Sequence, residues 1–512
     1  MKLMLSTPSR QWFALAVLLL IAAAVRWPFT TLDFNSLLNT YLVDDAFYYF
    51  KIASHLATDH RITYDGEQLT NGFHPLWLAV ITPFYTATND GIDFVYRVQW
   101  LMWLLDLLSV VVLYRTLLFC RISAVAVWIV ALIFCVHSSF VAVQMNGLET
   151  SLNTLLLLLL CYVFVAVFQQ NQAKYFPYLY LGVAAGLVFL ARTDNAITVF
   201  LLFSVLAWRE RQSWRASYPK LLAAVAVTGV IALPWLLWNW LHFGGLVQSS
   251  GKIETIYWGE PKFSWQHQAY SLLLAPIKIY QQAQLLGRLL VVPVSNAALP
   301  AIGLLVFLIA SLVWLWRGAR IVVEQKALAV FCVCVLAVFF YHAVFRSFVR
   351  TWYYMPVGLV CLLLLASFLS ALPRYWSICL GVLVVASVLW NYSLWRLPTT
   401  VHEQSSHLQG AEWINANTPQ DAVVGSMNSG VLSYLVQRKV INLDGVVDVR
   451  SMRAHWEKRQ PEYIHERGIS YLVDNDGALQ FFCRENPLHT CVPVFTFGDK
   501  INSNKVVKIV KK

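Results

Sequence analysis

The chain has 512 residues, of which 58% are hydrophobic and 13% are charged, and its mean hydropathy is +0.58. This composition excludes an ordinary soluble globular protein of the same length. The net charge of +11 does not indicate a nucleic-acid-binding protein, because the Lys and Arg residues are scattered among short loops rather than gathered on one soluble face.

Long apolar runs recur from Trp12 to Trp395 and predict a polytopic α-helical membrane protein. Each run is long enough to cross roughly 30 Å of hydrocarbon as a helix, which gives about eleven transmembrane helices. The first run lacks a small-x-small cleavage site and is expected to remain as a helix. The expected spans cover residues 12–29, 96–119, 122–143, 150–168, 176–191, 195–208, 220–241, 297–316, 327–345, 353–371 and 375–395.

The segment from His74 to Tyr85 is apolar but short, and Pro75 and Pro83 interrupt it. We interpret it as an interfacial or re-entrant helix rather than as a span. On this interpretation the two densest basic clusters fall on the cytoplasmic side, as the positive-inside rule requires. The first long loop, residues 30–95, and the C-terminal tail then face the extracytoplasmic side.

The tail, residues 396–512, differs from the expected membrane domain, residues 1–395, because its apolar runs are short and alternate with charged stretches. This pattern predicts a small α/β domain. Cys483 and Cys491 would form a disulfide if the domain lies in an oxidising compartment, and two reduced cysteines remain the alternative. The expected strands are Ala422–Gly425, Val440–Leu443, Ser470–Val473 and Val506–Val510, with helices near His402–Asn415 and Glu462–Arg467.

The segment YLVDDAFYYFKIASHLA, beyond the outer end of the first helix, contains two adjacent carboxylates, Asp44 and Asp45. As a helix it places Tyr48 and Lys51 on the face of Asp44 and apolar residues on another, so we expect it to lie flat on the membrane. Two neighbouring, partly desolvated carboxylates repel each other, which raises a carboxylate pKa toward the range of a general base. The alternative is that both residues only cap an interfacial helix.

Further polar residues lie at the expected outer ends of the spans. His74 directly precedes a helix that begins at Pro75, where an imidazole or a helix N-terminus can bind an anionic phosphate. Glu149 begins a span, a position that is costly for an ionisable group without a partner or water, so we favour a functional role. Arg192 and Asp194 lie on one turn, where mutual pairing and substrate contact both remain open.

Three more cations are candidates for binding a lipid phosphate. Lys252 lies on a Gly-rich loop that could fold over a phosphate, although a solvated loop lysine fits equally well. Arg346 and Arg350 precede an aromatic run, where they either bind a phosphate or lie at the membrane interface as arginines beside aromatic residues commonly do. We favour the second role. The two adjacent aspartates and Glu149 could hold a divalent cation, but the spacing does not require a metal.

The motifs, taken together and in order, resemble a known superfamily. The segments are VDDAFYYFKIA, NGFHPLW, NGLETSLN at 146–153, ARTDNAI at 191–197, GGLVQSSGK at 244–252, and NSGVLSY and INLDG in the tail. They resemble bacterial GT-C superfamily integral membrane glycosyltransferases, in particular polyprenyl-phosphate-dependent arabinofuranosyltransferase-like and mannosyltransferase-like proteins. The resemblance covers most of the chain.

The resemblance implies an activity and a set of site residues. An acidic residue in the first extracytoplasmic loop is the base, here Asp44 or Asp45, and the donor is a sugar on a polyprenyl phosphate. We expect inverting transfer of arabinofuranose, mannose or another hexose to a cell-surface glycan, glycolipid or protein at the bacterial cytoplasmic (inner) membrane. The residues expected to contact substrate are Tyr48, His74, Glu149, Arg192, Asp194, Lys252, Arg346 and Arg350.

Two other classes of function remain open: a transporter or flippase of lipid-linked sugars, and a noncatalytic membrane protein of envelope assembly. Transporters tend to have paired halves, broken helices and ionisable residues at mid-membrane. In this sequence the ionisable residues gather at the outer rim, and Asp106 is the mid-helix carboxylate that stands out. This distribution favours chemistry at the membrane interface.

Overall fold

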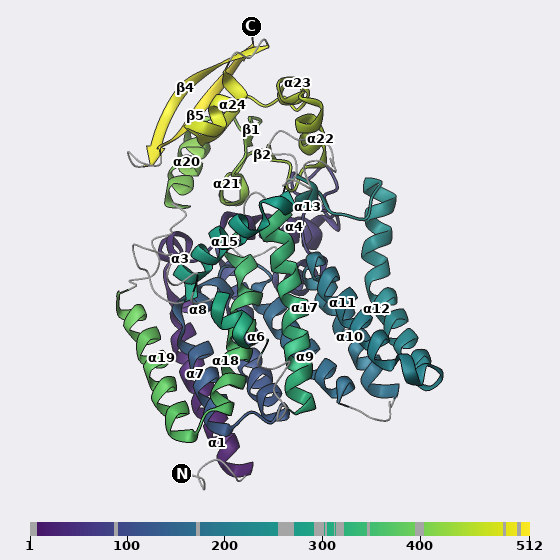
Figure 1. Ribbon diagram of the computed structural model, residues 1–512. Coiled ribbons are helices and arrows are strands. Elements are labelled where there is room, and N and C mark those ends of the chain that lie inside the picture. The colour runs from purple at the N-terminus through teal and green to yellow at the C-terminus, as the bar shows by residue number, and fades with distance from the viewer. Residues whose placement is uncertain are drawn as a thin grey trace.

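A bundle of apolar helices and a small C-terminal sheet domain at one end of it make up the structure, a computed structural model (Figure 1). The structure describes residues 8–86, 91–169, 175–253, 271–290, 302, 305–311, 313, 322–345, 349–394, 404–484, 488–498 and 503–511. We call residues 404–511 the C-terminal domain. The N-terminus lies at the far end of the bundle from this domain (Figure 1).

Within these ranges, six helices are long and apolar enough to cross a membrane. They are α1 (Pro8–Arg26), α6 (Gly91–Phe119), α9 (Thr150–Phe168), α12 (Trp214–Phe243), α17 (Val323–Phe345) and α18 (Met355–Ala371, preceded by η4, Thr351–Tyr354). A bent pair, α7 (Ala124–Val136) and α8 (Ser138–Gln144), adds a seventh span if its 59° break is counted within one crossing. The polytopic helical fold is confirmed, and the number of eleven spans stays a prediction.

Further helices complete the bundle. They are α10 (Tyr175–Ala191), η2 (Thr193–Asn195), α11 (Ala196–Arg209), η3 (Glu210–Ser213), α13 (Ser249–Ile253), α15 (Ala275–Leu290) and α19 (Arg374–Leu394). The span expected over residues 297–316 lies largely outside the described residues.

A fully buried ion pair joins the first helix to the centre of the bundle. The Arg26 guanidinium donates from Nε to Asp106 Oδ2 over 2.8 Å, and both side chains are completely buried. Its Nη1 also donates to the carbonyl oxygen of Cys135, and its Nη2 to Gln144 Oε1. Buried charges are tolerated in an apolar bundle when they are paired in this way, so Asp106 has a structural role.

The first loop forms short helices across the end of the bundle that carries the C-terminal domain. They are α2 (Pro28–Thr31), α3 (Phe34–Thr40), α4 (Asp44–Asp59), α5 (Pro75–Ile81) and η1 (Thr82–Phe84). Together α5 and η1 have 10 residues. A helix of that length rises only about 15 Å, too little to cross the hydrocarbon, which agrees with an interfacial or re-entrant segment.

The C-terminal domain is the α/β unit that the sequence predicts. Its mixed sheet has the order β2-β1-β3-β5-β4, parallel among the first three strands and antiparallel in the last two pairings. The strands are β1 (Val423–Ser426), β2 (Lys439–Asn442), β3 (Tyr471–Asn475), β4 (His489–Gly498) and β5 (Ser503–Lys511), and the helices are α20 (Gln404–Asn417), α21 (Gly430–Leu435), α22 (Val449–Glu457), α23 (Gln460–Glu466) and α24 (Asp476–Cys483).

One strand is missing from the sequence prediction. β4 contains Pro493, which argues against a central strand but is acceptable at the edge of a sheet, where β4 lies. The disulfide is formed: Cys483, at the end of α24, is bonded to Cys491 in β4, with 5.7 Å between their Cα atoms. The disulfide therefore ties this edge strand to the helix before it.

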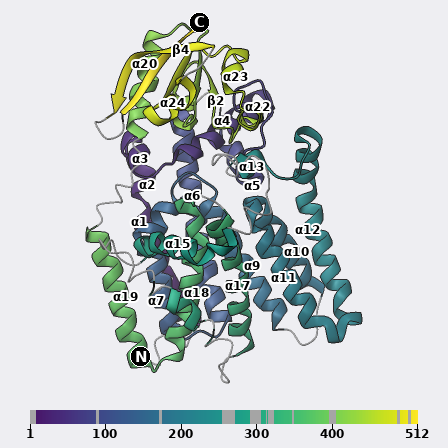
Figure 2. The same ribbon diagram turned by 45° about the horizontal axis from the view of Figure 1, so that its top comes forward.

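The C-terminal domain packs directly on the first loop and on α13, as both ribbon views indicate (Figures 1 and 2). Two close backbone approaches require glycine. A Cβ on Gly72 would lie 1.9 Å from the carbonyl oxygen of Val446, and one on Gly430 would lie 2.1 Å from the carbonyl oxygen of Asp44. Polar contacts add to the interface, because the Tyr64 hydroxyl donates to the backbone carbonyl of Ser429 over 2.8 Å.

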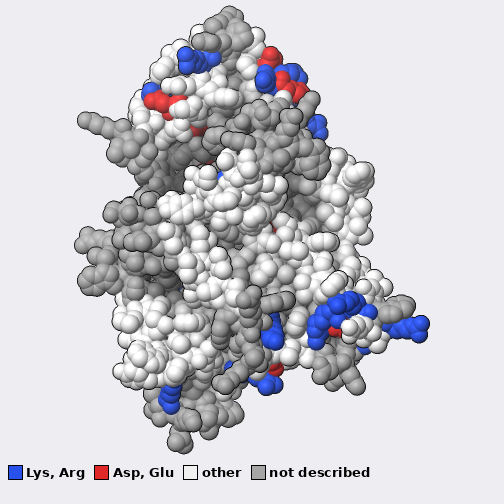
Figure 3. Space-filling view, in the orientation of Figure 1, with Lys and Arg blue, Asp and Glu red and all other residues white. Residues whose placement is uncertain are grey.

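Charged side chains gather at the two ends of the molecule on the face shown in Figure 3, and the described residues between them are almost uncharged there. Basic side chains gather at the end away from the C-terminal domain, where Figure 1 places the turn between α11 and α12. That turn includes Arg209 and Arg211. The uncharged band is the surface expected of a protein embedded in a bilayer.

Candidate active site

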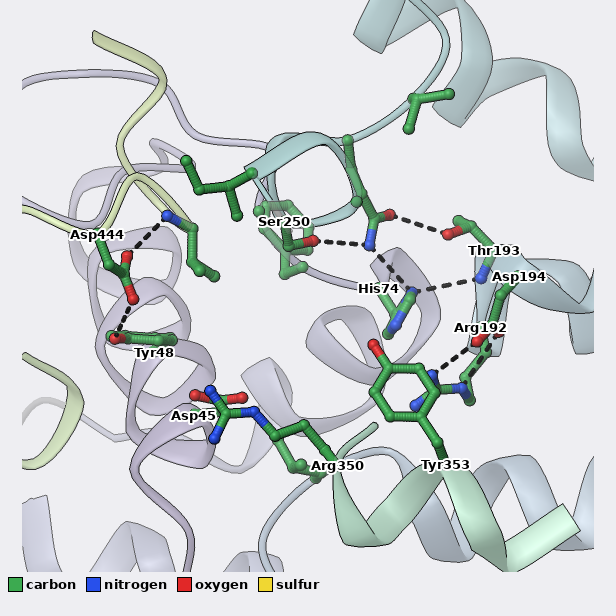
Figure 4. Close-up of a pocket in the computed structure, with 18 of the residues that line it drawn as sticks. Asp45, Tyr48, His74, Arg192, Thr193, Asp194, Ser250, Arg350, Tyr353 and Asp444 are labelled. Atoms are coloured by element: carbon green, nitrogen blue, oxygen red, sulfur yellow. Dashed lines mark hydrogen bonds and ion pairs between the residues drawn. The ribbon is translucent and has the colours of Figure 1, made fainter. Parts of the chain in front are cut away.

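A cavity of about 1270 Å³ lies between the C-terminal domain and the helices of the bundle (Figure 4). Five separate parts of the chain contribute to its wall. They are the first loop with Asp45, Tyr48 and His74, the helix junctions with Glu149, Arg192 and Asp194, the α13 region with Gln248 and Ser250, the η4 region with Arg350 and Tyr353, and the C-terminal domain with Asp444 and His455.

Asp44 does not line this cavity, because its carboxylate binds the start of a helix in the C-terminal domain. Its Oδ2 accepts a hydrogen bond from the backbone N–H of Gly430 over 3.0 Å, and its Oδ1 accepts one from Val431 over 2.8 Å. Burial raises the pKa of Asp44, and these two backbone hydrogen bonds oppose the rise. Asp44 therefore caps α21 rather than its own helix, and it fixes the C-terminal domain to α4.

Asp45 faces the cavity, although it is the next residue along the same helix. Successive residues on an α-helix are rotated by about 100°, so two adjacent side chains at the start of α4 point in different directions. Arg350, the residue before η4, lines the same cavity, and Figure 4 labels both side chains. The structure thus separates the two aspartates that the sequence leaves equivalent.

Tyr48 and Asp444 lie on the same side of the cavity as Asp45 (Figure 4). The Tyr48 hydroxyl is 3.5 Å from Asp444 Oδ2, and Asp444 Oδ1 accepts the N–H of Val446 over 2.7 Å. Burial raises the pKa of Asp444 to about 8, and the nearby charge of Asp45 adds to the rise. Near neutral pH the Asp444 carboxyl group is therefore largely protonated, and it can donate a hydrogen bond.

The opposite wall contains a network around Arg192. Its Nη1 donates to Glu149 Oε1 over 2.6 Å, and its Nη2 donates to Asp194 Oδ2 over 2.8 Å. His342 Nε2 is 2.9 Å from the same Asp194 oxygen, and the guanidinium lies 4.5 Å from the centre of the Tyr353 ring. Structural pairing, which the sequence left open beside substrate contact, is thus present, and two carboxylates already neutralise Arg192.

His74 is held in one tautomer beside this network. Its Nδ1 accepts the backbone N–H of Thr193 over 3.3 Å, so the proton of the neutral ring is on Nε2. That Nε2 lies 3.7 Å from Glu149 Oε1. The backbone before Pro75 is extended, as a proline requires of its predecessor, and this places the ring at the start of α5 and in the cavity wall.

One predicted cation is not among the residues that line the large cavity. Lys252 lines a separate cavity of about 220 Å³, together with Arg453 and Trp456, so its expected position over the donor phosphate is not supported. Burial lowers the pKa of Lys252, and the nearby charge of Arg453 adds to the effect. Arg346 lies outside the described residues.

The structure also adds residues that the sequence prediction omitted. Asp444 lies in the INLDG segment, which from the sequence could serve acceptor binding or packing equally well. Tyr353 belongs to an aromatic run that is typical of a membrane interface, and Gln248 lies in the GGLVQSSGK segment, of which only Lys252 is a predicted site residue. Gln248 Oε1 accepts a hydrogen bond from the Thr193 hydroxyl over 3.1 Å, and this contact connects α13 to the His74 side of the cavity.

The described part of the chain contains no group of three or more His, Cys, Asp or Glu side chains arranged to hold a metal ion. Asp44 turns toward α21, whereas Asp45 and Glu149 line different walls of the cavity. A divalent cation held jointly by Asp44, Asp45 and Glu149, one of the alternatives open from the sequence, is therefore not supported by their positions.

Solved structures of similar architecture identify the fold. ArnT from Cupriavidus metallidurans bound to undecaprenyl phosphate matches with a TM-score of 0.60 and 14% identity, over 96% of this chain and 97% of that chain. The same protein in the apo state matches with a TM-score of 0.59 and 14% identity, over 98% of both chains. The chain has the GT-C fold. The GT-C fold that the resemblance implies is thereby confirmed.

Other comparisons agree with the GT-C fold. The archaeal oligosaccharyltransferase AglB from Archaeoglobus fulgidus, in complex with an inhibitory peptide and a dolichol-phosphate, matches with a TM-score of 0.58 and 12% identity, over 99% of this chain and 77% of that chain. Residues 74–238 match the family described as dolichyl-phosphate-mannose-protein mannosyltransferase, and residues 396–505 match a domain family of unknown function. No curated protein sequence matches the chain significantly.

Proposed function

We propose that this GT-C protein is a glycosyltransferase that moves a sugar from a polyprenyl-phosphate donor to an acceptor hydroxyl, with Asp45 as the general base. The observation that carries the proposal is the position of Asp45 in the wall of a cavity large enough for two substrates. Two proteins of the same fold support the donor class, since one was solved with undecaprenyl phosphate and the other with a dolichol-phosphate.

The proposed reaction is one displacement at the anomeric carbon. Asp45 removes the proton of the acceptor hydroxyl, and the resulting oxygen forms a bond to the anomeric carbon. The bond between that carbon and the phosphate oxygen breaks, and the lipid phosphate leaves with the electron pair. Attack from the face opposite the leaving group inverts the configuration of the sugar.

Arg350 and His74 are the residues that we assign to the donor phosphate. Both line the cavity, and a departing phosphate needs positive charge or N–H donors at the point where its charge develops. His74 presents its Nε2 proton, because Nδ1 is occupied by the N–H of Thr193. Arg192 is less suitable, since Glu149 and Asp194 already bind it. Its role in the proposal is to hold the wall that carries Tyr353.

The proposal places the cavity and the C-terminal domain on the extracytoplasmic side of a bacterial inner membrane. The basic turn between α11 and α12 lies at the opposite end of the bundle, which supports this orientation through the positive-inside rule. The disulfide between Cys483 and Cys491 supports it as well, because such bonds persist in oxidising compartments. Arabinofuranose and mannose are the donor sugars to test, with a glycan, glycolipid or protein as acceptor.

The test compares Asp45→Asn with Asp59→Asn, a control at the exposed end of the same helix. Purified protein in lipid vesicles receives radiolabelled polyprenyl-phosphate arabinofuranose or mannose, and transfer to a cell-envelope extract is measured. Loss of a general base lowers the rate about 10²- to 10⁴-fold, so we expect that loss only in Asp45→Asn. Full transfer by Asp45→Asn would refute the base assignment, and translocation of the donor without transfer would favour the transporter alternative.

A further inference from the structure

The large cavity has two unlike walls. The bundle and the first loop contribute the cations, the imidazole and the carboxylates described above, whereas the C-terminal domain contributes neutral polar groups and an aromatic ring. The residues of the domain wall that matter here are Asn428, Asp444, His455, Lys458, Gln460 and Phe481. They come from separate loops and helices that the sheet brings together, so this wall exists only in the folded domain.

Phe481 is the apolar element of this wall. It lies on α24, and 57% of its side chain is exposed although it lines a cavity. Its ring stacks at 23° on the imidazole of His455, with 5.6 Å between the ring centres. An exposed aromatic face costs free energy in water, and in a polar cavity it is the surface on which the C–H face of a sugar ring packs.

The polar groups beside Phe481 are neutral and fixed in place. His455 Nε2 donates to the backbone carbonyl of Leu443 over 2.7 Å, and its Nδ1 accepts from Gln460 Nε2 over 2.8 Å. Burial lowers the pKa of His455, so the ring is uncharged at neutral pH. Planar amide and carboxyl groups next to an aromatic face suit a ligand with many hydroxyl groups, since they donate and accept at once.

Few charged groups lie on this wall, which narrows the class of ligand. Among its described residues, Lys458 is the basic group, and Asp444, largely protonated near neutral pH, is the acidic one. A site for a phosphate or another anion gathers cations and N–H donors, and Arg350 and the Nε2–H of His74 offer these elsewhere in the cavity. The domain wall therefore suits an uncharged polyhydroxyl ligand better than an anionic one.

We propose that Phe481, His455, Gln460 and Asp444 form a carbohydrate-binding subsite that holds the sugar acceptor, separate from the donor side of the cavity. That the bound carbohydrate is the acceptor rests on the proposed function. That this wall binds a carbohydrate does not. A polyprenyl donor must keep its chain in the bilayer, so its phosphate approaches from the bundle. The domain wall lies farther from the bundle and is left for the second substrate, whose hydroxyl then reaches Asp45.

The experiment measures binding of neutral glycosides to the full chain in lipid nanodiscs. Saturation-transfer difference NMR is run with methyl mannopyranoside and methyl arabinofuranoside, first with wild-type protein and then with Phe481→Ala and Trp456→Ala. Trp456 is a matched control, because it is an exposed aromatic residue of the same domain, 37% accessible, that lines the smaller cavity. Thermal unfolding of each variant confirms that the C-terminal domain is folded.

We expect at least one glycoside to bind the wild type and Trp456→Ala, with about tenfold weaker binding to Phe481→Ala, the loss expected for one ring contact. Added undecaprenyl phosphate should leave the glycoside signal in place. The proposal is overturned if no glycoside binds the wild type, if Phe481→Ala binds it equally well, if Trp456→Ala loses it as well, or if undecaprenyl phosphate displaces it. If undecaprenyl phosphate itself does not bind, the proposed donor is wrong, whereas a signal that depends on Phe481 still supports the carbohydrate subsite.

Discussion

Because Asp44 and Asp45 have different surroundings, we predict that substituting each of them with asparagine has a different effect. Asp44→Asn keeps the shape of the side chain but leaves one acceptor oxygen in place of two. Either Gly430 or Val431 then loses its carboxylate partner, and the new amide group turns its own N–H toward a backbone N–H. The variant should therefore loosen α21 from α4 without removing the base.

The magnitude follows from the contacts. A hydrogen bond to a charged group contributes about 1.5–3 kcal/mol, and one such bond is lost. Local opening of α21 should become easier by that amount, which corresponds to about 10- to 150-fold faster amide exchange in this helix. Hydrogen exchange mass spectrometry of the peptides that cover Gly430–Leu435 measures it directly.

Asp45→Asn provides the opposite result, with normal exchange in α21 and sugar transfer lowered about 10²- to 10⁴-fold. Asp59→Asn should leave both exchange and transfer unchanged, because this side chain is exposed at the end of α4. If Asp44→Asn abolished transfer while α21 exchanged at the wild-type rate, Asp44 would be acting in the chemistry, and the assignment of the two aspartates would be reversed.

Three further outcomes are expected. Arg26→Met should destabilise the bundle in detergent by about 3–5 kcal/mol, because it leaves Asp106 as an unpaired buried charge. The double variant with Asp106→Leu should regain most of that stability. An equal loss in the double variant would contradict the pairing. Serine at both Cys483 and Cys491 should lower the stability of the C-terminal domain by about 2.5 kcal/mol in urea-dependent proteolysis, as expected for closing a short loop, and an unchanged midpoint would argue against the bond. The folded pKa of Asp444, about 8, lies above its unfolded value of 3.8, so the stability that this group contributes is present below about pH 4 and is lost as the pH rises toward 8. The melting temperature of Asp444→Asn relative to wild type should therefore rise between pH 5 and pH 9. A constant difference in melting temperature would refute the titration.

Local sequence signals predict much of the fold. The long apolar runs identify the helices of the bundle, and the prolines around α5 indicate why that segment is too short to cross. In the C-terminal domain, short β-branched runs give four of the five strands. β4 is missed because Pro493 is a sign against strand structure unless the strand is known to lie at an edge, and edge position depends on the order of the whole sheet.

The candidate site is predicted only in part, since most of its contacts join distant segments. The sequence places Asp44 and Asp45 on one interfacial helix, but the partner of Asp44 lies 386 residues further along the chain. Nothing near the two aspartates indicates which of them meets that partner. The role of Asp444 cannot be predicted from the sequence either, because this loop residue lines the cavity only when the C-terminal domain packs on α4.

Because the C-terminal domain packs on the first loop, the cavity can form only late in the synthesis of the chain. Tyr48 and Asp444 face each other across 396 positions of sequence, so the ribosome has made most of the polypeptide before the pocket can close. An early, membrane-inserted intermediate therefore holds Asp45 without the second wall of the cavity. In the proposed reaction such an intermediate does not use its lipid donor, so sugar transfer begins only after the last domain has folded.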